Sequence, residues 1–437
     1  MKRLVLFTAG ICMSLLGGRA MAAAEAASAP AATPTAISGG DTAWMLLCTV
    51  LVLLMTIPGV ILFYSGMLRG KNALSIVAQG VASMAVVTLV WTLVAYSLAF
   101  TPGNGFFGGM GRALAEGIVG GSTAPHPSAP TVPEAAFFVF QLAFAIITFV
   151  IILGATAERI RLAAAVLFAG AWTLLVYAPV AHWVWHPTGW LAAMGHMDFA
   201  GGTVVHIASG ASGLMAAWML GPRRGFGKEP MVPHNLLVTV LGAGLLWAGW
   251  FGFNAGSAFA ATDRAAGALL VTQIGACSGA ILWGVCEHIH RGQWSVLGTM
   301  TGAIAGLIAI TPASGFVTPL GAMAIGGCGG VVCFLCVVNF KARTGIDDSL
   351  DVFALHGVGG IVGTVLTPVF ASAVIAPVTA NVGTQLAGAL AVAVYAMVAT
   401  WAILRVLGLI MNLRVDAEQE RVGLDISEHG EMIAPNA

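Results

Sequence analysis

Residues 199–214 read FAGGTVVHIASGASGL and place His206 among apolar and small residues. A second such stretch, DVFALHGVGGIVG at residues 351–363, contains His356. In a membrane-spanning chain an ionisable side chain is costly, and it usually faces a polar path through the protein. Two histidines in similar settings therefore predict one shared site built from two halves of a repeat. The small residues that follow them at helical spacing are Ser209, Gly210, Gly213, Gly359, Gly360 and Gly363.

The composition places the chain in a membrane. Of its 437 residues, 58% are hydrophobic and only 8% are charged, and the mean hydropathy is +0.93. Soluble domains carry about a quarter charged residues, so this chain cannot cover its surface with solvated charge. The formal net charge of zero gives no indication of a nucleic-acid partner, and we expect none. The 57 glycines are typical of helices that pack closely in lipid.

The N-terminus has the pattern of a secretory signal. Positive residues at 2 and 3 precede the short apolar run LVLFTAGICMSLLGG, and residues 20–22 form a small-x-small cleavage site. The alternative is a first transmembrane helix, but the run is short and a linker rich in Ala, Pro, Ser and Thr follows it. We therefore expect a signal peptide at 1–22, an extracytoplasmic linker at 23–40, and a bacterial inner membrane with the mature N-terminus outside.

About eleven stretches have the roughly 20 apolar residues that a helix needs to cross a bilayer. They are too long for barrel strands, and only helices or closed barrels satisfy their backbone in lipid. The expected fold is an all-α polytopic membrane protein whose transmembrane domain covers residues 41–413. The predicted spans are 42–66, 73–100, 133–157, 162–182, 200–220, 235–257, 265–288, 295–312, 319–340, 350–372 and 384–412.

Lysine and arginine in the loops predict the orientation. They concentrate after the odd-numbered spans, whereas the loops after even-numbered spans have only Arg112 and Arg264. Basic loops stay in the cytoplasm, so the odd loops and the C-terminus are expected there. The basic residues of the odd loops are Arg69, Lys71, Arg159, Arg161, Arg223, Arg224, Lys228, Arg291, Lys341 and Arg343.

This topology gives the two histidines a specific relationship. His206 lies on the fifth span, which runs inward, and His356 lies on the tenth, which runs outward. Spans one to five and six to ten would then form an inverted five-helix pseudo-repeat, a common transporter plan with the site near the membrane midplane. Facing imidazoles can share a proton or bind a small polar solute. The alternative is two buried histidines, each bonded to a backbone carbonyl.

Five segments of the chain resemble the bacterial ammonium transporters, the Amt family, which is akin to the Rh glycoproteins. The resemblance extends from about residue 41 to the C-terminus, and its most specific stretch is Asp198–Leu214. The other four segments are Tyr64–Asn72, Ala157–Arg161, Trp250–Ser257 and Asp351–Gly357. The resemblance implies transport of ammonium or ammonia through a hydrophobic pore in a homotrimer.

The same resemblance implies roles for individual residues along such a pore. His206 and His356 match the twin histidines that line it. Phe144 and Phe253 match the two rings of a phenylalanine gate. Taken singly, both phenylalanines would be ordinary packing residues, so their assignment depends on the joint pattern.

An outer ammonium-binding site is implied by four further matches. Trp185 and Ser257 match its aromatic wall and its hydrogen-bond acceptor, Asp198 supports it, and Phe140 contributes to the vestibule. An aromatic cage attracts a small cation through cation–π interaction. Alone, Trp185 would be an interface anchor, and Asp198 would bind the first free amides of the fifth helix. We expect Asp198 to bind these amides whether or not it also supports an ammonium site.

The charged segment at 414–437 resembles the family's cytoplasmic regulatory tail, on which a PII-type signalling protein acts. The alternative is a solvated tail.

Two other function classes stay open. An ammonium sensor of the same fold would usually carry a longer cytoplasmic extension. A membrane enzyme would need a metal, but no third ligand accompanies the histidine pair. We therefore expect no enzyme, no cofactor and no metal, with membrane lipid around the chain.

Overall fold

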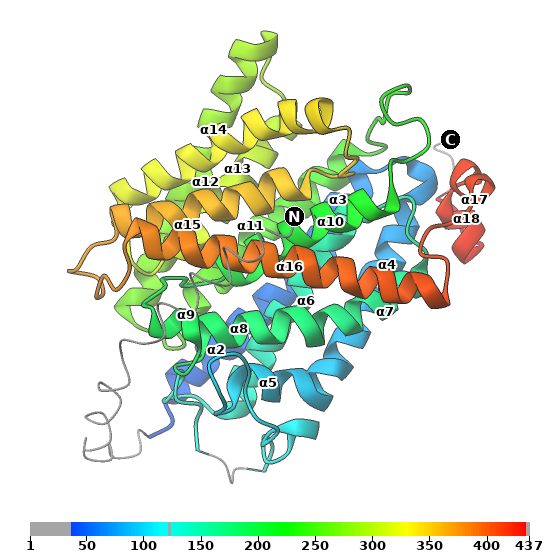
Figure 1. Ribbon diagram of the computed structural model, residues 1–437. Coiled ribbons are helices and arrows are strands. Elements are labelled where there is room, and N and C mark those ends of the chain that lie inside the picture. Colours follow the sequence, from blue (N-terminus) through cyan, green and yellow to red (C-terminus); the bar gives the residue numbers. More distant parts are fainter. Residues whose placement is uncertain (1–35, 121–123, 434–437) are drawn as a thin grey trace, which may run out of the picture. The chain divides into compact units, whose positions relative to one another are not determined.

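The structure, a computed structural model, describes residues 36–120 and 124–433, and its compact unit begins at Ile37 (Figure 1). The predicted signal peptide and residues 23–35 of the predicted linker lie outside the described residues. Within those residues the chain is helical and forms no β-sheet, since only three isolated bridges occur. The all-α prediction is confirmed.

Eleven helical segments among the described residues are long and apolar enough to cross a membrane. They coincide with the eleven predicted spans to within a few residues, except that the fourth continues to Ala193. In chain order, the spans are composed of α2 (Gly39–Leu54), η2 (Met55–Val60) and α3 (Ile61–Met67); η3 (Gly70–Asn72), α4 (Ala73–Val90), η4 (Trp91–Ala95) and α5 (Tyr96–Phe100); α6 (Glu134–Thr156); α7 (Leu162–Trp172), η6 (Thr173–Tyr177), α8 (Ala178–Trp185) and α9 (Trp190–Ala193); η7 (Gly202–Ile207) and α10 (Ala208–Leu220); α11 (Leu236–Gly256); α12 (Asp263–Arg291); α13 (Val296–Ile310) and η8 (Thr311–Ala313); α14 (Pro319–Thr344); η9 (Phe353–Gly357) and α15 (Val358–Phe370); and α16 (Val382–Ile410). Outside the spans lie η5 (Ala113–Ala115), α17 (Ala417–Val422) and α18 (Leu424–His429).

Helix α6 forms the centre of the bundle. Almost all of its side chains are buried, and it packs against α2, α4 and α10 (Figure 1). A helix that is apolar on every side is one that neighbours surround completely. The side chains of α6 are therefore available to line an internal path.

The two histidines lie on matching elements of the two halves. His206 is on η7 and His356 is on η9, and both segments are π-helical turns, a local structure that is frequent at functional sites. An aspartate stands eight residues before each histidine, Asp198 in one half and Asp348 in the other, and each accepts backbone amides at the start of its helix. Segment α10 packs on η9 while α15 packs on η7. This reciprocal packing supports the predicted pseudo-repeat.

A glycine permits the close crossing of these two halves. A Cβ atom at Gly210 would collide with the backbone of Gly357, the residue after His356. Small residues at helix crossings allow backbones to approach closely. The glycine next to the histidine motif therefore brings η9 against α10.

Charged residues from four loops meet in one buried network. The Glu158 carboxylate accepts from the backbone and guanidinium of Arg69 and from Arg223, which also pairs with Asp347. Burial opposes ionisation of Glu158 and Asp347, but the neighbouring guanidinium groups outweigh it and lower the pKa of both carboxyl groups. The loops after the first, third, fifth and ninth spans thus lie on one side, as the charge pattern predicts.

The C-terminal tail packs against this same side. Asp425 on α18 accepts from the amides of Leu74 and Ser75 at the start of α4. Glu428 accepts from the amide of Leu162 at the start of α7. A carboxylate at a helix N-terminus satisfies free amides and favours the helix dipole. The described part of the tail, residues 414–433, is therefore a packed element rather than a solvated extension.

Candidate functional site

The two histidines contact each other directly. The Nδ1 atoms of His206 and His356 are 3.1 Å apart, and both side chains are buried. Among the residues that the structure describes, neither Nδ1 atom bonds a backbone carbonyl, which was the alternative arrangement left open by the sequence. The Nε2 atom of His206 has no hydrogen-bond partner among the described residues. The pair therefore keeps a polar atom available in an apolar interior.

A succession of aromatic rings leads away from the histidines. The ring of His206 lies 6.2 Å from that of Phe253, and Phe253 stacks on Phe144 at 4.1 Å with an interplanar angle of 6°. The Phe144 ring in turn meets the edge of Trp185 at 5.9 Å. All distances are between ring centroids. The structure thus connects four of the predicted site residues in one line, with two stacked phenylalanines between the tryptophan and the histidine.

A cavity of about 60 Å³ lies at the Trp185 end of this line. Its wall consists of six aromatic rings and three hydrogen-bonding side chains, contributed by separate parts of the chain. These are Phe100, Phe137, Phe144, Trp185, Phe199 and Phe259, with Ser128, Gln141 and Ser257. The π-faces of such rings attract a small cation. Among the described residues, no carboxylate lines the cavity.

The polar groups at the cavity have defined partners. The Ser257 hydroxyl donates to the Phe253 carbonyl oxygen at 2.9 Å, so its oxygen lone pairs remain free to accept. The Trp185 indole N–H donates to the backbone oxygen of Asp198 at 3.0 Å, which orients the ring. Ser257 can therefore accept a hydrogen bond from a bound cation, whereas Trp185 offers it only a ring.

Asp198 and Phe140 stand behind the cavity wall. The Asp198 carboxylate accepts the amides of Gly201, Gly202, Thr203 and Val204, which is the expected contact with the first free amides of the fifth helix. The backbone oxygen of Asp198, not its carboxylate, accepts the Trp185 indole N–H. The Phe140 ring packs on Phe144 at 4.8 Å without lining the cavity.

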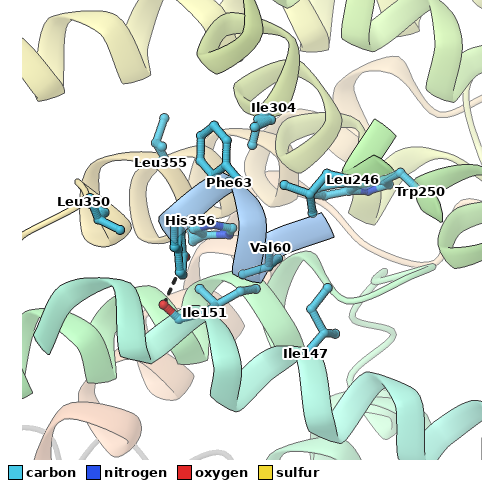
Figure 2. Close-up of a pocket in the computed structure, with 11 residues that line it drawn as sticks. Val60, Phe63, Ile147, Ile151, Leu246, Trp250, Ile304, Leu350, Leu355 and His356 are labelled. Atoms are coloured by element: carbon cyan, nitrogen blue, oxygen red, sulfur yellow. Dashed lines mark hydrogen bonds between the residues drawn. The ribbon is translucent and has the colours of Figure 1, made fainter. Parts of the chain in front are cut away.

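A second, smaller cavity lies on the other side of the histidines (Figure 2). Its volume is about 20 Å³, which suffices for one water-sized molecule. Its lining is apolar apart from His356, Trp250 and Tyr64, and the dashed line in Figure 2 is the hydrogen bond from the Tyr64 hydroxyl to the Ile151 carbonyl. Leu355 also lines a third cavity of about 250 Å³, together with Asp351. Two further cavities therefore lie near His356, with Leu355 in the lining of both.

The outer and the second cavity are mainly apolar, whereas charged side chains also line the third. Comparison with known proteins identifies the family in which this arrangement occurs. The profile described as Ammonium Transporter Family matches residues 43–434. The chain belongs to the ammonium transporter family. An ammonium transporter of Bacillus subtilis (strain 168) is 44% identical over 401 residues, covering 90% of this chain and 98% of that protein. One from Aquifex aeolicus (strain VF5) is 42% identical over 407 residues, covering 92% of this chain and 94% of that protein.

Solved structures give the same family. The crystal structure of Saccharomyces cerevisiae Mep2 matches with a TM-score of 0.81 at 36% identity, over 87% of this chain and 88% of that chain. A structure described as Sensor Amt Protein matches with a TM-score of 0.81 at 29% identity, over 89% of this chain and 98% of that chain. The predicted family is confirmed, and its named relatives are transporters rather than enzymes. The apolar helices and the family together make this a multi-pass membrane protein.

The sequence did not single out every residue of this family member's site. The Trp250 ring stacks on His206 at 5.5 Å, and its N–H donates to Thr311. Trp250 stands one helical turn before Phe253, so the helical spacing could have placed it on the same face as this predicted site residue. Phe199 follows Asp198 directly and lines the outer cavity, but nothing in the sequence distinguished it from a packing residue.

Proposed function

We propose that this protein conducts ammonium or ammonia across the membrane along the line from Trp185 to His356. One observation carries the proposal: the outer cavity, the stacked pair Phe144–Phe253 and the pair His206–His356 follow one another in direct contact. The family membership supports the substrate, since its curated relatives are named ammonium transporters.

Recognition takes place in the outer cavity. The aromatic wall attracts the cation, and the Ser257 oxygen accepts one of its N–H groups. That hydrogen bond distinguishes ammonium from sodium or potassium, since a bare metal ion has no proton to donate. The role of Asp198 is to hold the Trp185 ring in position through its backbone oxygen, and Phe140 supports Phe144 from behind.

The phenylalanine gate and the two histidines determine whether ammonium or ammonia crosses the membrane. Moving an unpaired charge into an apolar passage costs many kcal/mol. Either ammonium leaves its proton behind and ammonia passes the gate, or the proton follows by a separate polar route. The twin histidines suit both routes because an imidazole accepts and donates through distinct nitrogens.

We further propose the family's assembly and regulation for this chain. The proposal comprises a signal peptide at 1–22, a linker at 23–40, a transmembrane domain at 41–413 and a regulatory tail at 414–437. It also comprises a homotrimer in a bacterial inner membrane, with the N-terminus periplasmic and the C-terminus cytoplasmic. The packed α17–α18 tail supports a cytoplasmic docking face for a PII-type protein. Deleting residues 415–437 should leave conduction intact and remove inhibition by such a protein.

A second candidate function is ammonium sensing. The match to the Sensor Amt Protein favours it, since the likeness extends over 89% of this chain. A sensor would bind ammonium at the same outer cavity, so binding alone does not separate the two functions. Sustained flux of ammonium separates the two functions.

Electrophysiology on the reconstituted protein tests the proposal. We expect currents or uptake with ammonium, weaker transport of methylammonium, and none with potassium. Comparing current with radiolabelled methylammonium uptake distinguishes charged from neutral transport. Binding of ammonium without any flux in either assay would favour the sensor and overturn the transporter.

A further inference from the structure

Phe259 has a backbone conformation that its residue type avoids. Its φ angle is 56°, in the left-handed region, at the turn that follows the end of α11. Glycine is the usual residue in this region at helix ends, because a Cβ atom is strained there. A bulky aromatic side chain in this conformation therefore costs folding free energy that glycine would avoid.

Hydrogen bonds hold the turn in this conformation. The Phe259 amide donates to the Gly256 carbonyl at 2.9 Å, and two residues later the Ala261 amide donates to the Asp41 carboxylate at 2.9 Å. Strained residues persist only where the surroundings determine their geometry, and they cluster at functional sites. This turn carries Ser257 as well, so the strain lies next to the outer cavity.

The strained backbone directs the Phe259 ring to the cavity wall. The ring lines the outer cavity and packs on two rings of α6, with centroid distances of 5.3 Å to Phe137 and 6.0 Å to Phe140. It thereby bridges α6 and the turn at the end of α11. The Phe259 ring is therefore the aromatic part of the lining that this turn supplies, beside Ser257.

We propose that Phe259 is a specificity-determining residue of the outer site, whose ring completes the aromatic wall and limits the size of the bound cation. This inference rests on the proposed function. A residue that only packed the turn would fill space equally well from an unstrained backbone. The cavity requires a π-face at this place, and the left-handed conformation delivers it.

Uptake kinetics of ammonium and methylammonium test the inference, with wild-type protein and the variants F259G and F259L in proteoliposomes. F259G relieves the backbone strain and opens the wall. F259L keeps an apolar side chain but removes the π-face. L114G is the matched control, because Leu114 has a φ of 60° but is 71% exposed and does not line the cavity.

We expect F259G and F259L to raise KM for ammonium about two- to fivefold, the range of one cation–π contact. Maximal velocity should stay unchanged, because the gate and histidines are intact. In F259G the KM for methylammonium should rise less than that for ammonium, so discrimination between the two falls. L114G should leave every constant unchanged.

Two results would overturn the role of Phe259. One is an unchanged KM and unchanged discrimination in F259G or, if that variant does not fold, an unchanged KM in F259L. The other is an equal loss of maximal velocity for both cations at constant KM, which would indicate a packing role. Wild-type protein that transports neither cation would contradict the proposed function instead.

Discussion

The Nδ1 atoms of His206 and His356 face each other at 3.1 Å. A neutral imidazole carries a proton on only one ring nitrogen, so one Nδ1 donates and the other accepts. Because the rings come from the two halves of the pseudo-repeat, this single hydrogen bond connects the halves at the centre of the path. In the proposed function, conduction and the packing of the repeats therefore depend on the same contact.

Replacing His206 by Ala should reduce or abolish selective ammonium conduction, because it removes one of the two facing imidazoles from the proposed path. The change also leaves the His356 Nδ1 atom buried without a partner, which costs roughly 1–3 kcal/mol of folding free energy. Currents with ammonium and potassium in proteoliposomes provide the measurement. His288→Ala is the matched control, because that side chain is exposed on α12. Unchanged ammonium currents and unchanged exclusion of potassium would contradict the role of His206.

Replacing Gly210 by Ala should destabilise the folded protein by about 1–3 kcal/mol, as overpacking of a close contact does. The new Cβ atom would collide with Gly357 and push η9 away from α10. Thermal unfolding of the purified protein measures the effect. Gly244→Ala serves as control, since a Cβ there meets nothing within 4 Å. It should be neutral or stabilising by up to about 1 kcal/mol. Equal unfolding temperatures for the two variants would contradict this account.

Replacing Glu158 by Gln should destabilise the protein by about 3 kcal/mol near neutral pH, since it removes this carboxylate from buried Arg223 and from the partly exposed Arg69. The pKa of Glu158 is below its ordinary value of 4.5 in the folded state. Its stabilising effect is therefore complete above pH 4.5 and is lost as the pH falls through the lowered pKa.

Unfolding temperatures measured from pH 3 to pH 7 test this prediction. The wild type should lose stability steeply below about pH 4.5, and the difference from Glu158→Gln should shrink over the same range. A constant difference between the two proteins across all pH values would exclude a stabilising role for the ionised carboxylate.

Replacing Asp425 by Asn should loosen the tail at a cost of about 1 kcal/mol, the usual value for a carboxylate that binds free helix amides. Asp425 is buried against the start of α4, where it accepts the amides of Leu74 and Ser75. Limited proteolysis should cut the tail faster in the variant. Glu431→Gln is the control, since Glu431 is exposed. Equal cleavage rates in both variants would show that Asp425 does not hold the tail.

The spans were predictable from sequence because each needs only enough apolar residues to cross lipid. The predicted end of the fourth span at 182 was early, because α8 and α9 continue to Ala193 around a turn that residues 186–189 form. Asp348 was recognisable as the counterpart of Asp198 by its position eight residues before a histidine. Phe259 could not be recognised as a site residue from the sequence. Glycine is the residue type that signals a left-handed backbone conformation, and a phenylalanine gives no such signal.

The sequence by itself determined the class, the number of spans and the family, since hydropathy, loop charge and local motifs are properties of neighbouring residues. The tertiary structure decided which rings line the cavity, and it decided that His206 and His356 bond each other rather than backbone carbonyls. These residues are 150 positions apart. Their contact arises only from the packing of η7, η9 and α10 across Gly210, and such packing depends on three-dimensional geometry that no local pattern encodes.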